Sequence, residues 1–292
     1  MSEYENAIEI KGVTKRYDGF TLDNVSFEVP KGCIMGFIGQ NGAGKTTTIR
    51  SLLNITKIDG GEIALLGLDH AKDEREIKKR LAVVFDELPF HDFFTANDMA
   101  RIFEGIYPQW DNAVYMQYLD RFQLPRKKKI GQFSKGMKMK LQIACGLSHN
   151  AELLVMDEAT TGLDPVVRDE ILHIFMEYLQ DGERSILMSS HITSDLEKIA
   201  DSVTFIDRGK ILLSGFKDEI LERHGILKCS KEELADIEND DIVSVRTNSY
   251  GAEVMVYDRE AAARRYSGAI IDHASLDDIM LFYVHKGTKE WW

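Results

Sequence analysis

The chain has 292 residues, of which 44% are hydrophobic and 29% are charged, and its formal net charge is -12. This length and balance predict a globular protein with one large domain and a smaller appendage. The acidic excess argues against nucleic acid as a partner, because sequence-independent binding depends on Lys and Arg side chains that meet phosphates.

The sequence also indicates where the protein works. No apolar run approaches the roughly 18 residues that a membrane-spanning helix needs. The first residues, MSEYENAIEI, lack the basic and apolar segments of a signal peptide. Cys33, Cys145 and Cys229 are far apart and lie in or beside apolar runs, so we expect buried, reduced thiols and a cytosolic location. At a membrane, another chain would have to supply the spans.

The N-terminal part is predicted to be rich in strands. Residues 7–38 contain AIEIKGV, FTLDNVSFEV and CIMGFIG, whose apolar residues alternate or run together between Asp, Gly and Pro. A helix over about 45–54 follows a glycine-rich loop. A short strand near 62–66 and a charged helix near 73–80 come next, and the run 81–85 is typical of a buried strand.

The rest of the chain changes character twice. Residues 87–150 hold the helical patterns TANDMARIFEGIY, DNAVYMQYLDRF and SKGMKMKLQIACGLS, which predict a helical insert. From LLVMD to KILLSG, strands alternate with helices, which favours a parallel sheet covered on both faces. Shorter elements follow and end in the amphipathic helix SLDDIMLFYVHK. We therefore expect a large domain over residues 1–225 and a C-terminal accessory region over residues 226–292.

The glycine-rich loop carries the first chemical signal. Residues 39–46, GQNGAGKT, match the phosphate-loop pattern G-x-x-x-x-G-K-[ST] between a strand and a helix. Backbone N–H groups of such a loop surround phosphate oxygens, and the helix N-terminus adds positive potential. We expect Lys45 to reach the β- and γ-phosphates and the Thr46 hydroxyl to bind Mg²⁺. The predicted nucleotide-binding residues of this segment are Gly39, Asn41, Gly42, Ala43, Gly44, Lys45, Thr46 and Thr47. Kinases, GTPases and motors share this loop, so other motifs must decide the reaction.

Two adjacent acids, Asp157 and Glu158, end the apolar strand LLVMD. Successive side chains on a strand point to opposite faces, so we expect different roles for the two carboxylates. Asp157 suits the Mg²⁺ shell, and Glu158 suits a catalytic general base that acts on water. The alternative is a strand end with solvated acids, which the phosphate loop disfavours.

Three further motifs follow the same chemistry. Ser134 is placed as the N-cap of the helix KMKLQIACGLS, whose first N–H groups can receive an anion from a second molecule. The segment TGLDP, which contains Asp164, predicts a tight turn into a helix. His191 follows the strand RSILMSS. A histidine there is more often structural, but this one is positioned for catalytic contact with a γ-phosphate.

In this order the motifs resemble those of the ATP-binding cassette of ABC transporters, over about residues 5–225. The phosphate loop, signature helix, paired acids, D-loop and switch histidine of that family look like residues 39–47, 133–137, 153–158, 161–164 and 190–191. The resemblance implies an ATPase with a P-loop NTPase core, an N-terminal antiparallel β subdomain, a helical insert and a small C-terminal α/β appendage.

The resemblance also implies how ATP is held. In the family, two subunits form a head-to-tail dimer, and each ATP lies between the phosphate loop of one subunit and the signature helix of the other. Ser134, Gly136 and the D-loop residue Asp164 then join the nucleotide-binding residues. Tyr17, in KRYDG, looks like the aromatic residue that stacks on adenine, although a half-buried tyrosine at a strand end is the alternative.

The sequence departs from the family pattern in two places. Lys135 and Met137 replace the Gly and Gln of the usual signature Leu-Ser-Gly-Gly-Gln, while Ser134 and Gly136 are retained. Asp86 stands where the family has the glutamine of the Q-loop. Our hypothesis is that Asp86 still reaches the Mg²⁺ shell, as an anion in place of a neutral amide.

The segments IYPQWD, FSKGMKMKL, DEATTGLDPVVR and SLDDIMLFYV look like one bacterial subgroup of single-cassette subunits. That likeness implies a separate integral-membrane permease subunit, a homodimer of cassettes at the cytoplasmic face of the membrane, and export, often linked to antimicrobial-peptide resistance. The aromatic segments PFHDFF and RIFEGIYPQW suit the family's docking surface, or alternatively the core of the helical insert.

Two alternatives remain at this point. A chromosome-associated or translation-associated ABC ATPase would need a long coiled-coil insertion, or two cassettes with basic surfaces, and the sequence shows neither. A phosphate-loop kinase would leave the signature helix without a role.

Overall fold

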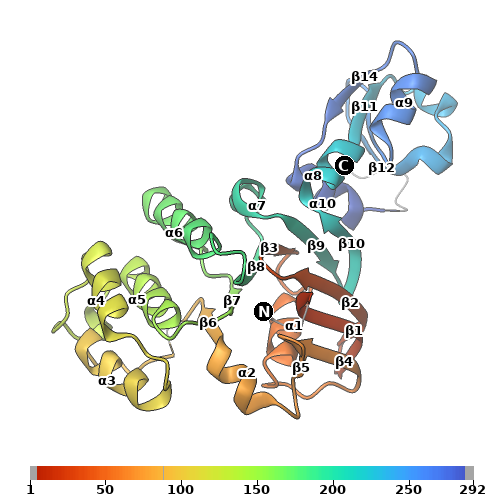
Figure 1. Cartoon of the computed structure of the whole chain (residues 1–292). Coiled ribbons are helices and arrows are strands. Elements are labelled where there is room, and N and C mark those ends of the chain that lie inside the picture. Colours follow the sequence, from red (N-terminus) through yellow and green to blue (C-terminus); the bar gives the residue numbers. More distant parts are fainter. Residues whose placement is uncertain (1–4, 88, 287–292) are drawn as a thin grey trace.

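The structure is a computed structural model that describes residues 5–87 and 89–286. It contains an N-terminal sheet, a central sheet and a C-terminal sheet, with a group of helices at the opposite end from the C-terminal sheet (Figure 1). The functional motifs belong to the central sheet and the helices beside it.

The N-terminal sheet is antiparallel, with the strand order β2-β1-β4-β5. Its buried apolar residues alternate with exposed ones along β2, as expected of a sheet with one face in the core. The predicted antiparallel subdomain is therefore confirmed. The strands are β1 (Asn6–Tyr17), β2 (Phe20–Pro30), β4 (Gly60–Leu65) and β5 (Leu68–Asp69).

The central sheet has the strand order β10-β9-β3-β8-β7-β6. All neighbouring pairs from β9 to β6 are parallel, and β10 pairs antiparallel with β9. Its strands are β3 (Ile34–Ile38), β6 (Leu81–Phe85), β7 (Leu153–Asp157), β8 (Ser185–Ser190), β9 (Ser202–Asp207) and β10 (Lys210–Phe216).

The antiparallel edge strand corrects the expectation of an all-parallel sheet. Arg208 and Gly209 form a two-residue connection between β9 and β10, and both have positive φ, 46° and 76°. Such a turn joins adjacent antiparallel strands, whereas a parallel pair needs a crossover of a dozen or more residues.

Both faces of the central sheet are buried, which explains the continuous apolar runs of β3, β7 and β8. On β7, Leu153 and Val155 pack with α1 and the N-terminal sheet. The alternate residues Leu154 and Met156 pack with the helices on the other face. One strand thus contributes to two hydrophobic cores through its period of two.

The helical elements match the predicted insert and the alternation that follows it. The helices α3 to α5 form the insert between β6 and β7 (Figure 1). The α-helices are α1 (Lys45–Leu52), α2 (Glu74–Arg80), α3 (Ala96–Ile106), α4 (Asn112–Arg121), α5 (Lys135–Leu147), α6 (Pro165–Tyr178), α7 (Thr193–Ile199), α8 (Lys217–Arg223), α9 (Arg259–Arg265) and α10 (Leu276–Val284), and the 3₁₀ helices are Ile130–Gln132, Glu233–Asp236 and Asn239–Asp241.

The C-terminal sheet is antiparallel, with the order β12-β13-β11-β14. It returns to the rest of the molecule through α10, where the Leu276 N–H donates to Glu197 Oε1 at 2.7 Å. His224, at the end of α8, contacts the Tyr283 hydroxyl at 2.8 Å. The strands are β11 (Gly225–Cys229), β12 (Ile242–Thr247), β13 (Ala252–Val256) and β14 (Ile270–His273).

Two further expectations can be compared with the described residues. Within 5–87 and 89–286, no helix is long and apolar enough to span a membrane. Cys145 is buried, but Cys33 and Cys229 are only half-buried, so the expectation of buried thiols is wrong for two of the three. Cys33 immediately precedes β3, and Cys229 is the last residue of β11.

Candidate functional site

The carboxyl ends of three neighbouring parallel strands meet at one edge of the central sheet. Strand β8 lies between β3, which leads into the phosphate loop, and β7, which leads into the paired acids. Segments far apart in the sequence are thereby brought together, as is usual at the carboxyl edge of an open α/β sheet.

The phosphate loop, residues 39–46, is tightly built. Gly44 has φ 117°, and a Cβ there would lie 2.8 Å from the Leu22 side chain, so only glycine fits. Lys45 is 5% exposed, and its Nζ donates to the carbonyl oxygens of Gly39 at 2.6 Å and Gln40 at 3.2 Å. The same ammonium lies 2.9 Å from Glu158 Oε1. The loop therefore already points its cation toward the paired acids.

Asp157 is held from the neighbouring strand. It is the last residue of β7 and pairs in register with Ser189 of β8. Ser189 Oγ donates to Asp157 Oδ1 at 2.8 Å and accepts the Glu158 N–H at 3.0 Å. One buried hydroxyl thus orients the side chain of the first acid and the backbone of the second.

Glu158 lies one residue beyond β7 and has φ 54°, in the left-handed region that non-glycine residues rarely adopt. The expectation that strand alternation separates the two acids is therefore wrong, because a left-handed turn separates them. Strained backbone of this kind is concentrated at functional sites.

Three groups surround the Glu158 carboxylate. Thr161 Oγ1 donates to Oε2 at 2.8 Å, and His191 Nδ1 lies 2.7 Å from the same oxygen. The Lys45 ion pair reaches Oε1, to which the described residues donate no well-directed hydrogen bond. Burial raises the pKa of Glu158, but Lys45, Thr161 and His191 outweigh it and hold this pKa below its ordinary value. The carboxylate is therefore ionised at neutral pH.

The other predicted residues occupy distinct places. Tyr17 ends β1 and is 47% exposed, with Lys15 Nζ 5.5 Å from its ring centroid. Asn41 and Thr46 are exposed on the phosphate loop and α1, and Thr47 is half-buried. Gly39, Ala43 and Gly44 are buried and Gly42 is exposed.

The signature segment lies at the start of α5. Ser134 is the N-cap, and its Oγ accepts the Met137 N–H at 3.3 Å, as predicted. Gly136 lies against Val167 of α6. The N-cap of α6 is Asp164. Lys135 Nζ forms an ion pair with Asp86 Oδ1 at 2.5 Å. The two departures from the family pattern are therefore in contact with each other.

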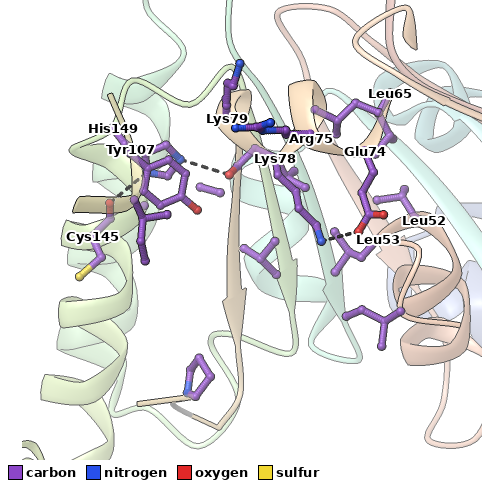
Figure 2. Close-up of a pocket in the computed structure, with 18 of the residues that line it drawn as sticks. Leu52, Leu53, Leu65, Glu74, Arg75, Lys78, Lys79, Tyr107, Cys145 and His149 are labelled. Atoms are coloured by element: carbon purple, nitrogen blue, oxygen red, sulfur yellow. Dashed lines mark hydrogen bonds and ion pairs between the residues drawn. The ribbon is translucent and has the colours of Figure 1, made fainter. Parts of the chain in front are cut away.

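A groove of about 950 Å³ lies between α1, α2 and β6 on one side and α3 and α5 on the other. Figure 2 shows Leu52, Leu53 and Leu65 on one wall and Tyr107 and His149 on the other. The Tyr107 and His149 rings stack with centroids 4.0 Å apart. The charged residues of the groove come mainly from α2, namely Glu74, Arg75, Lys78 and Lys79.

Comparisons with known proteins agree with this geometry. The family model described as ABC transporter matches residues 22–161. The bacitracin transport ATP-binding protein BcrA of Bacillus licheniformis is 36% identical over 208 residues, covering 70% of this chain and 68% of BcrA. The chain belongs to the ABC transporter family. The linearmycin resistance ATP-binding protein LnrL of Bacillus subtilis (strain 168) is 28% identical over 260 residues, covering 87% of this chain and 83% of LnrL. A solved "Structure of ATP binding subunit of ABC transporter" aligns with a TM-score of 0.67 at 27% identity, covering 73% of this chain and 91% of that one.

This ABC transporter chain is the ATP-binding subunit, an ATPase whose hydrolysis drives transport, and it works in a complex with membrane subunits. The predicted fold class is likewise confirmed.

Sequence reasoning missed three side chains at the cassette's site. Ser189 and Thr161 hold the paired acids, and Gln142 of α5 hydrogen-bonds both backbone groups of Phe85. Ser189 lies opposite Asp157 only through the register between β7 and β8, which the sequence does not show. The sequence likewise carries no signal for Gln142.

Proposed function

We propose that two copies of this subunit bind two ATP molecules, each with Mg²⁺, at the interface between the copies. ATP hydrolysis there drives export through a separate membrane subunit. The observation that carries the catalytic part is the meeting of Lys45, Glu158 and His191 at one edge of the central sheet. A cation for phosphate, an ionised carboxylate and a histidine are the groups that ATP hydrolysis requires at one place.

ATP binding changes the partners of Lys45 in this proposal. The backbone N–H groups of the phosphate loop bind the β- and γ-phosphates, and Lys45 leaves the Gly39 and Gln40 carbonyls for the phosphate oxygens. Glu158 then orients a water molecule for attack and accepts its proton, while His191 contacts the γ-phosphate. Tyr17 stacks on adenine with one face of its exposed ring.

The residues present fit Mg²⁺, which prefers oxygen ligands. Asp157 has one oxygen bound to Ser189, and among the described residues no hydrogen bond or ion pair reaches its second oxygen. The Thr46 hydroxyl is exposed at the start of α1. Thr46 and Asp157 would hold the ion, which neutralises charge on the β- and γ-phosphates. Asp86 is paired with Lys135 at 2.5 Å, so in this proposal it stays outside the Mg²⁺ shell. An altered Mg²⁺ dependence in an Asp86→Asn variant would return Asp86 to that shell.

The signature segment supplies the other half of each ATP site. Ser134 and Gly136 are at the N-terminus of α5, where the first turn carries no acidic side chain to satisfy its N–H groups. Asp164 caps the neighbouring helix α6. A second subunit placed head-to-tail would bring the γ-phosphate of its bound ATP to this surface. A homodimer would therefore have two equal sites.

The groove of Figure 2 is the proposed docking place for a cytoplasmic segment of the membrane subunit. Its walls are mostly apolar, and its lining includes Phe85, the residue before Asp86. A docked segment would therefore contact the strand that leads to the nucleotide site. We therefore propose that the cassette works at the cytoplasmic face of the membrane. The names of BcrA and LnrL, which refer to bacitracin transport and linearmycin resistance, support export.

We assign these roles to residues 1–225, with 87–150 as the helical insert, and regard 226–292 as an accessory region. Residues 287–292 of that region lie outside the described residues.

Glu158→Gln tests the catalytic proposal. The amide keeps the shape of the side chain but cannot accept a proton, so hydrolysis should fall by at least about 10²-fold. In the presence of ATP, the dimer of this variant should then accumulate, and light scattering measures its mass. Native turnover by this variant would remove Glu158 from its role, and a monomer at saturating ATP would contradict the shared site.

A further inference from the structure

The end of β6 is fixed to the middle of the signature helix. Strand β6 is at the edge of the central sheet, so Phe85 lacks a strand partner on its outer side. Gln142 of α5 fills this place: its side-chain oxygen accepts the Phe85 N–H at 3.1 Å, and its amide donates to the Phe85 carbonyl at 3.0 Å. Gln142 is 4% exposed. The backbone just before Asp86 is therefore held against α5.

Asp86 itself is held against the first turn of that helix. Its Oδ1 lies 2.5 Å from Lys135 Nζ, and the two side chains are 44% and 43% exposed. The Lys135 side chain also covers Gly162 of the D-loop, since a Cβ on Gly162 would lie 3.4 Å from Nζ. Lys135 thus lies between two loops of the nucleotide site.

Neither residue of this pair is favourable alone. A lysine in the first turn of a helix opposes the positive end of the helix dipole. Phe85 pairs in register with Asp157, so Asp86 lies at the same edge of the sheet as the paired acids. An unpaired carboxylate there would repel the phosphates of ATP, because nearby like charges destabilise each other. The ion pair lowers both costs, although solvent screens it, and it joins two of the positions at which this chain departs from the family pattern.

We propose that Lys135 is a positioning residue for ATP binding. It holds the Asp86 carboxylate against the signature helix and neutralises the negative charge that Asp86 would otherwise present to the γ-phosphate. The inference rests on the proposed function, because it assumes that ATP binds between the phosphate loop and a signature segment. Lys135 acts through Asp86, and its contribution disappears when Asp86 carries no charge.

A double-mutant cycle tests this in the full-length chain that also carries Glu158→Gln, at saturating Mg²⁺. Lys135→Gln leaves Asp86 unpaired and should raise the ATP concentration for half-maximal dimerisation on the order of tenfold. Asp86→Asn should change it less than threefold. The double variant Asp86→Asn with Lys135→Gln should return to within about threefold of the starting protein, since the repulsive charge is gone.

The outcomes separate the explanations. If the double variant remains as impaired as Lys135→Gln, Lys135 acts on ATP directly and the inference is wrong. Equal, additive losses from the two single variants would also overturn it. Failure of the starting protein to bind ATP or dimerise would instead overturn the proposed function.

Matched controls come from the same helix. Lys138 lies 3.7 Å from Asp92 and forms the next ion pair of α5. Lys138→Gln and Asp92→Asn should leave the ATP requirement unchanged, and Lys135→Arg should retain it within about twofold because the charge is kept. A general loss of helix stability would move both sets together, which circular dichroism on heating would detect.

Discussion

The two halves of the nucleotide site differ in how completely the chain builds them. In the phosphate-loop half, Lys45 and Asp157 are buried. The Glu158 carboxylate contacts Lys45 at 2.9 Å and His191 at 2.7 Å. The Ser189 hydroxyl hydrogen-bonds Asp157 at 2.8 Å and the Glu158 N–H at 3.0 Å. The signature half, around Ser134 and Lys135, is exposed and contains one cap and one surface ion pair.

This difference follows from what each half has to contact. The phosphate-loop half is complete in one chain, because three strand ends supply it. The signature half presents N–H groups to solvent and becomes useful only when another molecule covers them. We therefore expect changes in the first half to affect ATP binding and chemistry, and changes in the second half to affect mainly dimerisation.

The largest expected effect comes from Lys45→Met, which keeps an unbranched side chain one atom shorter and removes its charge. Hydrolysis should fall by about 10²–10³-fold, because a cation that stabilises developing phosphate charge is lost. Phosphate release measures the rate of hydrolysis, and binding of a fluorescent nucleotide measures the affinity for ATP. Lys198→Met, at an exposed position on α7, is the control, and an equal loss there would contradict the assignment.

Ser189→Ala should come next. It removes the hydrogen bond that orients Asp157 and leaves the Glu158 N–H without its acceptor. We expect kcat to fall by about 10–100-fold and stability to fall by about 1–3 kcal/mol. Ser185→Ala removes an equally buried hydroxyl from the same strand, which accepts the Gly32 N–H at 3.0 Å. It should cost similar stability without the loss of kcat; equal kcat in the two variants would refute the role of Ser189.

Ser134→Ala tests the signature half. ATP binding to the single subunit should be unchanged, while the ATP concentration for half-maximal dimerisation should rise by about 3–30-fold, as expected when one hydrogen bond to a charged group is lost. The lost cap should lower stability by about 1 kcal/mol. Ser275→Ala removes the corresponding cap from α10 and controls for that cost. Weaker binding to the single subunit would break the division between the two halves.

The smallest effect on nucleotide is expected from His224, which lies outside both halves. Burial lowers the pKa of His224, the Ile220 carbonyl opposes this, and Arg223 adds to the lowering. The unfolded chain therefore takes up the proton first as pH falls. The stability contribution of neutral His224 is complete above about pH 6.5 and is lost as pH falls toward the folded pKa.

Urea unfolding at pH 7.5 and 5.5 measures this contribution. His224→Gln should be destabilised by about 1–3 kcal/mol at pH 7.5, since Tyr283 loses its buried partner, and should lose less on acidification than the unmodified chain. ATP binding should be unchanged. A pH dependence equal to that of the unmodified protein would show that His224 is not the group responsible.

The sequence predicted the parts of the site that are local. The phosphate loop is set by glycines that tolerate positive φ and by a lysine at the helix start. The caps at Ser134 and Asp164 are likewise local, because a short polar side chain satisfies N–H groups three residues on. The order of these motifs was enough to indicate an ATP-binding cassette.

Only the tertiary structure decided the contacts between segments. The left-handed turn at Glu158, the Ser189 bridge to Asp157 and the ion pair of Asp86 with Lys135 depend on strand register and on how α5 packs against β6. The sequence by itself therefore determined the chemistry of the cassette, through residue types at fixed spacing. The tertiary structure determined how its charges are balanced, because that balance arises between residues that are distant along the chain.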